Sequence, residues 1–208
     1  MTLTTTYFGP VEWYSQLYRA DHVLLEACES FIKQTYRNRC VIATANGPQT
    51  LTVPVEHASK YSPLTTHHSP TIKDIRISNH GSWRRVHWNA LQSAYSESPF
   101  FEYYADDIRP FFEKDYEFLY DFNFEIIQKM CELLDIHPHI GHTTSFVKEQ
   151  GARSKEQENT SGSDKSLAPC PSPLAPYWQV FAHKHGFLPN LSILDLLFCM
   201  GPEGIFYL

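Results

Sequence analysis

The opening of the chain constrains its fold most. Thr2–Phe8 is rich in threonine and aromatic residues and ends at the turn residues Gly9-Pro10, which predicts a short strand. A helical pattern follows over Val11–Arg19, and the apolar run His22–Leu25 predicts a second strand. A helix between two strands provides the long crossover that a parallel connection needs, so these two strands are expected to pair in parallel. The opening therefore predicts an α/β fold whose small sheet begins with a βαβ-like unit.

A β-hairpin is predicted next. Cys40–Thr44 and Thr50–Val55 are β-prone runs, and the five residues between them contain Asn46-Gly47, a common hairpin turn. Glu56–Pro70 has no hydrophobic period and is predicted to be a surface loop. Asp74–Ser78 alternates isoleucine with charged residues, which predicts one more short strand and a mixed sheet.

Helices dominate the rest of the chain. Apolar residues at three- and four-residue spacing predict helices over Ser82–Ser96, Phe100–Glu113 with an interruption at Pro110, Tyr116–Leu134 and Leu191–Met200. Asn190 is the predicted N-cap of the last one. The α/β class with a helical C-terminal half is Rossmann-like by analogy only, and such an analogy carries little functional weight.

One segment differs in composition from everything around it. Glu149–Pro176 consists mainly of serine, proline, glycine, glutamate, lysine and glutamine and has no aromatic residue. Such a segment buries too little apolar surface to offset its ordering entropy, so we expect it to be disordered. Because apolar helical sequence resumes after it, residues 1–208 are predicted to form a single domain interrupted by this loop.

Composition excludes several classes of function. The 208 residues are 42% hydrophobic and 19% charged with a net charge of −6, which indicates a globular protein whose main partner is not nucleic acid. No signal-peptide pattern opens the chain and no apolar run is long enough for membrane insertion, so a cytoplasmic location is expected. The five cysteines form no CxxC pair, and neither a disulfide framework nor a cysteine zinc site is predicted.

His139-Ile140-Gly141-His142 spells the HIGH signature of class I aminoacyl-tRNA synthetases. In those enzymes the motif follows the first strand and is accompanied by a KMSKS loop, whereas here it follows a long helix and has no such partner. We predict a turn at the exit of that helix. The neighbouring histidines lack a carboxylate or thiol at a spacing that completes a ligand set, so no metal site is predicted.

Two candidate sites remain. Arg37 and Arg39 alternate onto one face of an extended chain, where their guanidinium groups can bind a phosphate or carboxylate; salt bridges to acidic residues are the alternative. His87 lies among aromatic residues, including Trp83 and Trp88, and is either a general base in a pocket or a core histidine with satisfied hydrogen bonds.

Several strings in a fixed order resemble the WbqC-like family of bacterial proteins. They are Tyr7-Phe8-Gly9-Pro10, Lys33–Arg39, Leu51–Val55, Trp83 with His87-Trp88, Ser93–Tyr95 with Ser98–Phe101, and Leu191–Phe198. The resemblance covers nearly everything except Glu149–Pro176. Thr5-Thr6 stands where many members carry Gln-Pro.

The resemblance implies a setting. The family is associated with gene clusters for surface polysaccharide, including O-antigen, and its members are presumed to be transferases. It implies a cytosolic transferase for an amino-sugar or nucleotide-sugar precursor, with an anionic partner such as a nucleotide sugar or acyl donor; a non-catalytic binding or scaffold protein of the same pathway is the alternative. The predicted base is His87, and the predicted ligand-binding residues are Tyr7, Tyr36, Arg37, Asn38, Arg39 and Trp88. The residues name no cofactor.

Overall fold

A computed structural model describes residues 1–56, 70–145 and 175–208 of the chain. The loop predicted over Glu56–Pro70 and the disorder predicted over Glu149–Pro176 lie almost entirely outside these described residues.

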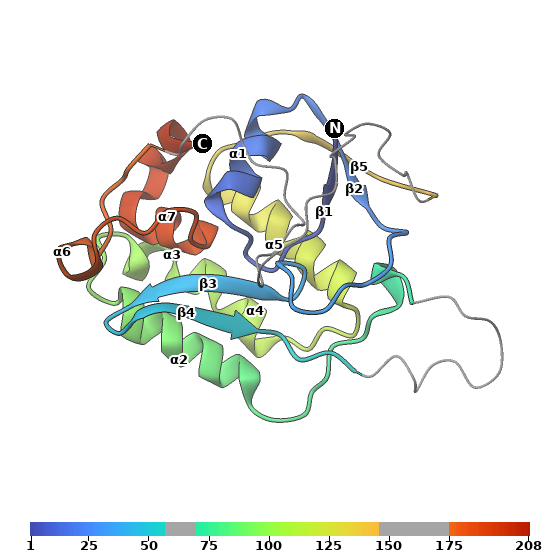
Figure 1. Ribbon diagram of the computed structural model, residues 1–208, viewed down its shortest axis with the longest axis horizontal. Helices are drawn as coiled ribbons and strands as arrows, with labels where there is room; N and C mark the ends of the chain where they lie inside the picture. The colour runs from blue at the N-terminus through green and yellow to red at the C-terminus, as the bar shows by residue number, and fades with distance from the viewer. Residues whose placement is uncertain (57–69, 146–174) are drawn as a thin grey trace, which may run out of the picture.

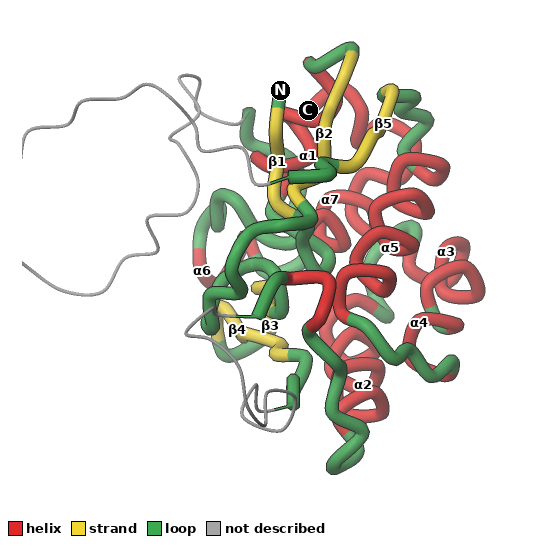
Figure 2. Tube along the Cα trace, turned by 90° about the vertical axis from the view of Figure 1, so that its right-hand side faces the viewer, coloured by secondary structure: helices red, strands yellow, loops and turns green. Residues whose placement is uncertain are grey.

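A three-stranded parallel sheet contains the predicted opening unit. Strand β1 (Thr2–Thr4), helix α1 (Val11–Arg19) and strand β2 (His22–Glu26) form the βαβ unit, and β5 (His139–His142) completes the order β1-β2-β5. Figure 2 shows the three strands side by side. Leu3 pairs with Leu25 at the β1–β2 contact, and both side chains are buried. The predicted α/β fold is confirmed, although β1 ends at Thr4 rather than at Phe8.

The predicted helix-exit turn at the HIGH tetrapeptide is wrong, because these residues form β5. His139–His142 pairs in parallel with His22–Leu25 of β2. A Cβ atom on Gly141 would lie 2.9 Å from the Leu24 side chain, so the missing side chain gives Leu24 its space between the strands. The partner strand lies more than a hundred residues earlier, which local patterns do not reveal.

The predicted hairpin is confirmed as a separate two-stranded sheet. Strands β3 (Arg39–Thr44) and β4 (Gly47–Thr52) are antiparallel, with Thr44 opposite Gly47. In Figure 1 the hairpin lies beside helix α2 (Trp83–Tyr95), away from the parallel sheet.

The strand predicted over Asp74–Ser78 is not formed. A short 3₁₀ helix, η2 (Ile72–Asp74), precedes two isolated bridges, from Ile77 to Val55 and from Arg76 to Phe118. Ile75 and Ile77 are buried as the alternation requires, but each neighbouring segment offers a single pairing residue, so no ladder develops.

The predicted helices of the second half of the chain form with shifted ends. Besides α2 they are α3 (Phe101–Ile108), α4 (Pro110–Glu113), α5 (Leu119–Leu133) and α7 (Ile193–Met200). The short helix α6 (Ala182–His185) and the 3₁₀ helix η3 (Gly201–Tyr207) were not predicted. The predicted N-cap of α7 is wrong: Ser192 caps it, accepting from the Leu194 amide. Asn190 instead accepts from the backbone amide of Glu12 in the first turn of α1.

Within the described residues, one hydrophobic cluster joins both sheets to helices α1 to α5 and α7. Helices α2 to α5 gather on one side of the molecule (Figure 2). Tyr7, Phe8 and Trp13, all without exposed surface, follow β1 into this cluster. The first loop of the βαβ unit is thereby placed against α2.

Candidate functional site

The Tyr7–His87 pair lies in the middle of the core. The Tyr7 hydroxyl is 2.9 Å from Nδ1 of His87, and the imidazole is 4% exposed. Burial lowers the pKa of His87 to about 4, and a hydrogen bond to the backbone of Thr52 offsets part of this effect. The imidazole is therefore neutral at pH 7. Since a carbonyl only accepts, the ring donates to Thr52 and Nδ1 accepts from Tyr7.

Aromatic rings enclose this pair. The His87 ring lies 5.2 Å from Trp83 and 6.5 Å from Phe112, centroid to centroid, while Tyr7 packs 5.7 Å from Phe122. Burial raises the pKa of Tyr7 well above its usual range, so the phenol stays protonated. A neutral imidazole is what a general base requires, yet both of its nitrogens have partners inside the protein.

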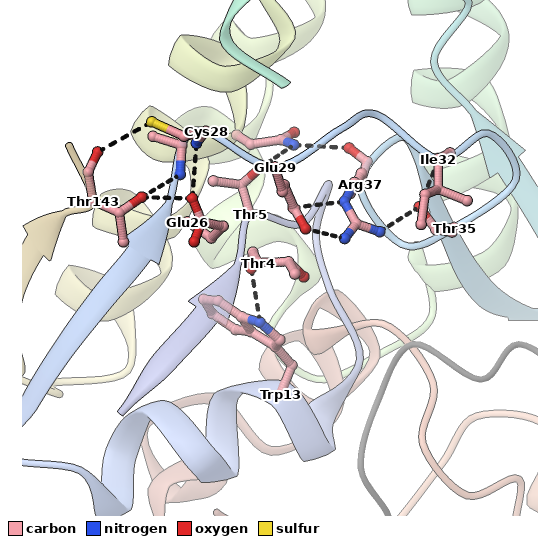
Figure 3. Close-up of polar contacts among 12 residues, drawn as sticks. Thr4, Thr5, Trp13, Glu26, Cys28, Glu29, Ile32, Thr35, Arg37 and Thr143 are labelled. Atoms are coloured by element: carbon pink, nitrogen blue, oxygen red, sulfur yellow. Dashed lines mark hydrogen bonds and ion pairs between the residues drawn. The ribbon is translucent and has the colours of Figure 1, made fainter. Parts of the chain in front are cut away.

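Arg37, the first of the two arginines predicted to bind an anion, already forms an ion pair inside the protein. Arg37 is 4% exposed and binds Glu29 through both arms of its fork, with 2.7 Å between Nε and Oε1 (Figure 3). A further bond joins Arg37 to the Thr35 hydroxyl. Strand β3 begins only at Arg39, so the alternation that was to aim Arg37 and Arg39 onto one face does not apply.

The neighbouring predicted residues, Tyr36, Asn38 and Arg39, differ in how many of their polar atoms have hydrogen-bond partners. Asn38 donates to the Val53 carbonyl at 3.0 Å, and its Oδ1 has no hydrogen-bond partner among the described residues. Nε of Arg39 is likewise buried and without a partner there. The Tyr36 carbonyl accepts from the Tyr7 amide at 2.9 Å, which joins this string to the loop after β1.

A polar network that was not predicted from the sequence lies at the carboxyl ends of β2 and β5. The Thr143 hydroxyl donates to Glu26 at 2.6 Å and accepts from the Ala27 amide, while the Cys28 amide donates to Glu26 at 2.8 Å (Figure 3). Glu26 is 4% exposed. The network ties the two strand ends together. The signal available in the sequence is an acidic residue at the end of an apolar strand.

A basic cavity lies at the N-terminal end of α2, and we call it the basic pocket. It has a volume of about 330 Å³ and is lined by Gly81, Ser82, Arg84, Arg85, Trp88, Arg109, Phe112 and Glu113. The lining therefore includes three arginines and two aromatic residues. Trp88 is the one sequence-predicted ligand residue that lines it.

The three arginines of the basic pocket differ in their pairing. Arg84 forms an ion pair with Asp115 at 3.2 Å, and Arg109 with Glu113 at 2.6 Å. Arg85 is exposed and has no ion-pair partner among the residues that the structure describes. The pocket therefore carries excess positive charge.

The start of α2 adds hydrogen-bond donors to the basic pocket. The Ser82 side chain does not cap the helix. The first helical hydrogen bond is donated by the Val86 amide to the Ser82 carbonyl. The preceding amides of the first turn have no helical acceptor. Unbonded amides and guanidinium groups together favour a phosphate or a carboxylate.

Two features are absent from the part of the chain that the structure describes. No group of three or more histidine, cysteine, aspartate or glutamate side chains there could hold a metal ion. None of the helices described is both long and apolar enough to cross a membrane.

Comparison with known proteins gives a family match. The model of the WbqC-like protein family matches residues 5–170. The chain is also similar to a protein of Mycobacterium tuberculosis (strain ATCC 25618 / H37Rv) named "Uncharacterized protein Rv1507c", with 27% identity over 201 residues, 86% of this chain and 83% of that protein. No solved structure matches the chain.

Proposed function

Because the chain belongs to the WbqC-like protein family, we propose that it is a cytosolic transferase acting on an amino-sugar or nucleotide-sugar precursor of bacterial surface polysaccharide. The family resemblance suggests the setting, and the chemistry of the basic pocket suggests the substrate class. The donor is an anionic precursor such as a nucleotide sugar.

The basic pocket is the observation that carries this proposal. Its volume of about 330 Å³ lies within the range of small-molecule sites, roughly 300–1,000 Å³. Arginine forks bind phosphate oxygens bidentately, and Arg85 has no acidic partner to displace first. Trp88 and Phe112 supply the apolar contacts that a sugar or base ring requires. In this proposal Arg84, Arg85 and Arg109 take the anion-binding role first predicted for Arg37 and Arg39.

His87 remains the predicted general base of the proposed transferase. It shares α2 with Arg84, Arg85 and Trp88, and its ring is 6.5 Å from Phe112, which lines the pocket. Phe112 therefore packs against the proposed base and also lines the pocket, and in this proposal its movement gives His87 access to the ligand.

Binding without turnover is the second candidate function. The observation that favours it is the pairing of the predicted catalytic and clamping groups, since His87 is bonded to Tyr7 and Arg37 to Glu29. A scaffold or carrier would use the basic pocket in the same way and leave His87 as part of the core.

Ligand binding with a matched pair of variants tests the proposal. Nucleotide sugars and inorganic pyrophosphate should raise the melting temperature, because a ligand at 100 times its dissociation constant adds about 2.7 kcal/mol of stability. Arg85→Ala should weaken this binding about tenfold or more, since a hydrogen bond to a charged group contributes about 1.5–3 kcal/mol. Lys33→Ala, which removes a positive charge at an exposed position outside the pocket, is the control. Equal binding by the wild type and Arg85→Ala would rule the pocket out.

Turnover separates the two candidates. Release of the nucleoside diphosphate from a bound nucleotide sugar, in the presence of an amino-sugar acceptor, is expected of the transferase. Binding without release, at every acceptor concentration, would favour the scaffold.

A further inference from the structure

A second cavity lies beside the basic pocket, and we call it the acidic cleft. Its volume is about 390 Å³, and its polar lining consists of Glu56, Arg76, Asn79, Asp115, Tyr116 and Glu117. Three carboxylates and one guanidinium group thus line a cavity of about the same size as the basic pocket. The signs of the two linings are opposite.

Arg84 connects the linings of the two cavities. Arg84 is one of the residues that line the basic pocket, while its Nη1 is 3.2 Å from Asp115 and its Nη2 is 3.0 Å from Asn79, both of which line the acidic cleft. The side chain is 15% exposed, and Nε is buried without a partner among the described residues. One half-buried arginine therefore lines the basic pocket and bonds to two residues of the acidic cleft.

The carboxylates of the acidic cleft are not all neutralised. Glu117 is paired with Arg76 and Asp115 with Arg84. Glu56 has no ion-pair partner within the described residues, and its backbone amide is anchored by a bond to the Arg76 carbonyl. A carboxylate that is fixed at its backbone and open at its side chain accepts hydrogen bonds from an ammonium group.

We propose that the acidic cleft binds the acceptor of the transferase, an amine-bearing sugar whose protonated amino group is held by Glu56. This inference rests on the proposed function, because it assigns the two substrates to the two sides of Arg84. The anionic donor lies on the basic side and the cationic acceptor on the acidic side. Arg84 connects the two sites, because it lines the basic pocket and bonds to two residues of the acidic cleft.

The shared arginine also couples the two sites. A phosphate in the basic pocket attracts the Arg84 guanidinium group and weakens its hold on Asp115. The carboxylate of Asp115 then adds to the negative charge of the acidic cleft, and the ammonium group binds more tightly. Because such coupling is reciprocal, an amine in the cleft strengthens binding of the anion by the same factor.

Calorimetric titration of the full chain with three probes tests the assignment. D-Glucosamine, under mildly acidic conditions that protonate its amine, is the probe of the cleft; N-acetyl-D-glucosamine is the matched neutral sugar, and inorganic pyrophosphate probes the basic pocket. Glucosamine should bind about tenfold or more tightly than the acetylated sugar. Glu56→Gln should remove this preference without changing pyrophosphate affinity. Glu203→Gln, an exposed charge loss on η3, is the control and should keep the preference.

Titration of glucosamine in the presence of pyrophosphate tests whether Arg84 couples the two sites. Bound pyrophosphate should tighten glucosamine binding about fivefold or more, the lower end of ordinary coupling between sites, and Arg84→Gln should abolish this effect. Equal affinities for the two sugars, or an unchanged preference in Glu56→Gln, would overturn the acceptor site. Absence of coupling in the wild type would overturn the role of Arg84.

The outcomes also separate this inference from the proposed function. If pyrophosphate binds but glucosamine shows no preference, the acceptor site fails and the donor pocket stands. If glucosamine binds through Glu56 and pyrophosphate does not bind, the donor pocket fails and the cleft stands as an amine site.

Discussion

Arg37 and Glu29 are the residues whose removal tests the buried framework most directly. Arg37→Met leaves the Glu29 carboxylate buried without its cation, which should lower the free energy of unfolding by about 3–5 kcal/mol. The double variant Arg37→Met with Glu29→Met removes both charges and should recover much of this loss. Urea denaturation of the wild type, both single variants and the double variant measures the coupling. A double variant less stable than Arg37→Met would contradict the ion pair as the cause.

The contrast between Arg37 and Arg85 shows what a sequence reveals at the residue scale. Arg37 was predicted as a ligand residue and Arg85 was not, because spacing alone does not reveal which arginine has an acidic partner. Glu29, eight residues before Arg37, meets it through the turns of the intervening loop. Arg85 is left open because α2 presents it outward. Trp88 was predicted as a ligand residue and does line the basic pocket, whereas Arg109, the C-cap of α3, lines the same pocket from a separate helix and was not predicted.

At the scale of an element, the end of α7 depends on Gly201. Its φ is +55°, and a Cβ atom would lie 2.6 Å from the Phe100 ring. Gly201→Ala therefore combines backbone strain with overpacking, and should cost about 1–3 kcal/mol more than backbone strain alone. Gly186→Ala is the matched control, because Gly186 ends α6 with a φ of +71° and nothing lies within 4 Å of its would-be Cβ. Equal melting temperatures for the two variants would show that Phe100 yields freely.

Elements with a local cause were predictable, and those with a distant cause were not. The βαβ opening, the hairpin and α5 each follow from periodicity and turn residues within the element itself. Strand β5 is four residues long and exists because β2 lies beside it, so its own sequence indicated only a turn. Asn190 was misassigned for a similar reason: its amide side chain bonds to Glu12, in a helix at the other end of the chain.

At the scale of the whole molecule, two buried groups, His87 and Asp195, have pKa shifts with opposite effects on stability. Asp195 is fully buried in α7 and accepts hydrogen bonds from Tyr95, Tyr177 and Gln179. Burial raises its pKa from 3.8 to about 6, and these hydrogen bonds limit the rise. Between about pH 4 and pH 6 the folded protein therefore holds a proton on Asp195 and none on His87. Unfolding reverses both, since the free carboxyl ionises and the free imidazole gains a proton.

The two groups give opposite pH dependences of stability. The lowered pKa of His87 makes stability fall as pH drops from about 6.5 to about 4, and the raised pKa of Asp195 makes stability fall as pH rises from about 4 to about 6. Each effect reaches about 3 kcal/mol at 1.4 kcal/mol per pKa unit, so in the wild type they nearly cancel.

When either group is removed, the pH dependence of the free energy of unfolding should follow the remaining group alone. Asp195→Asn should leave a protein whose free energy of unfolding increases by about 3 kcal/mol from pH 4 to pH 6.5, because only the His87 effect remains. His87→Phe should lose about as much between pH 4 and pH 6, because only Asp195 then titrates differently in the folded chain. Both variants lose stability at every pH through broken hydrogen bonds, so the readout is the slope of urea-derived free energies against pH, compared with the nearly flat wild type. Parallel slopes in the two variants would show that these groups do not set the pH response, because the argument requires slopes of opposite sign.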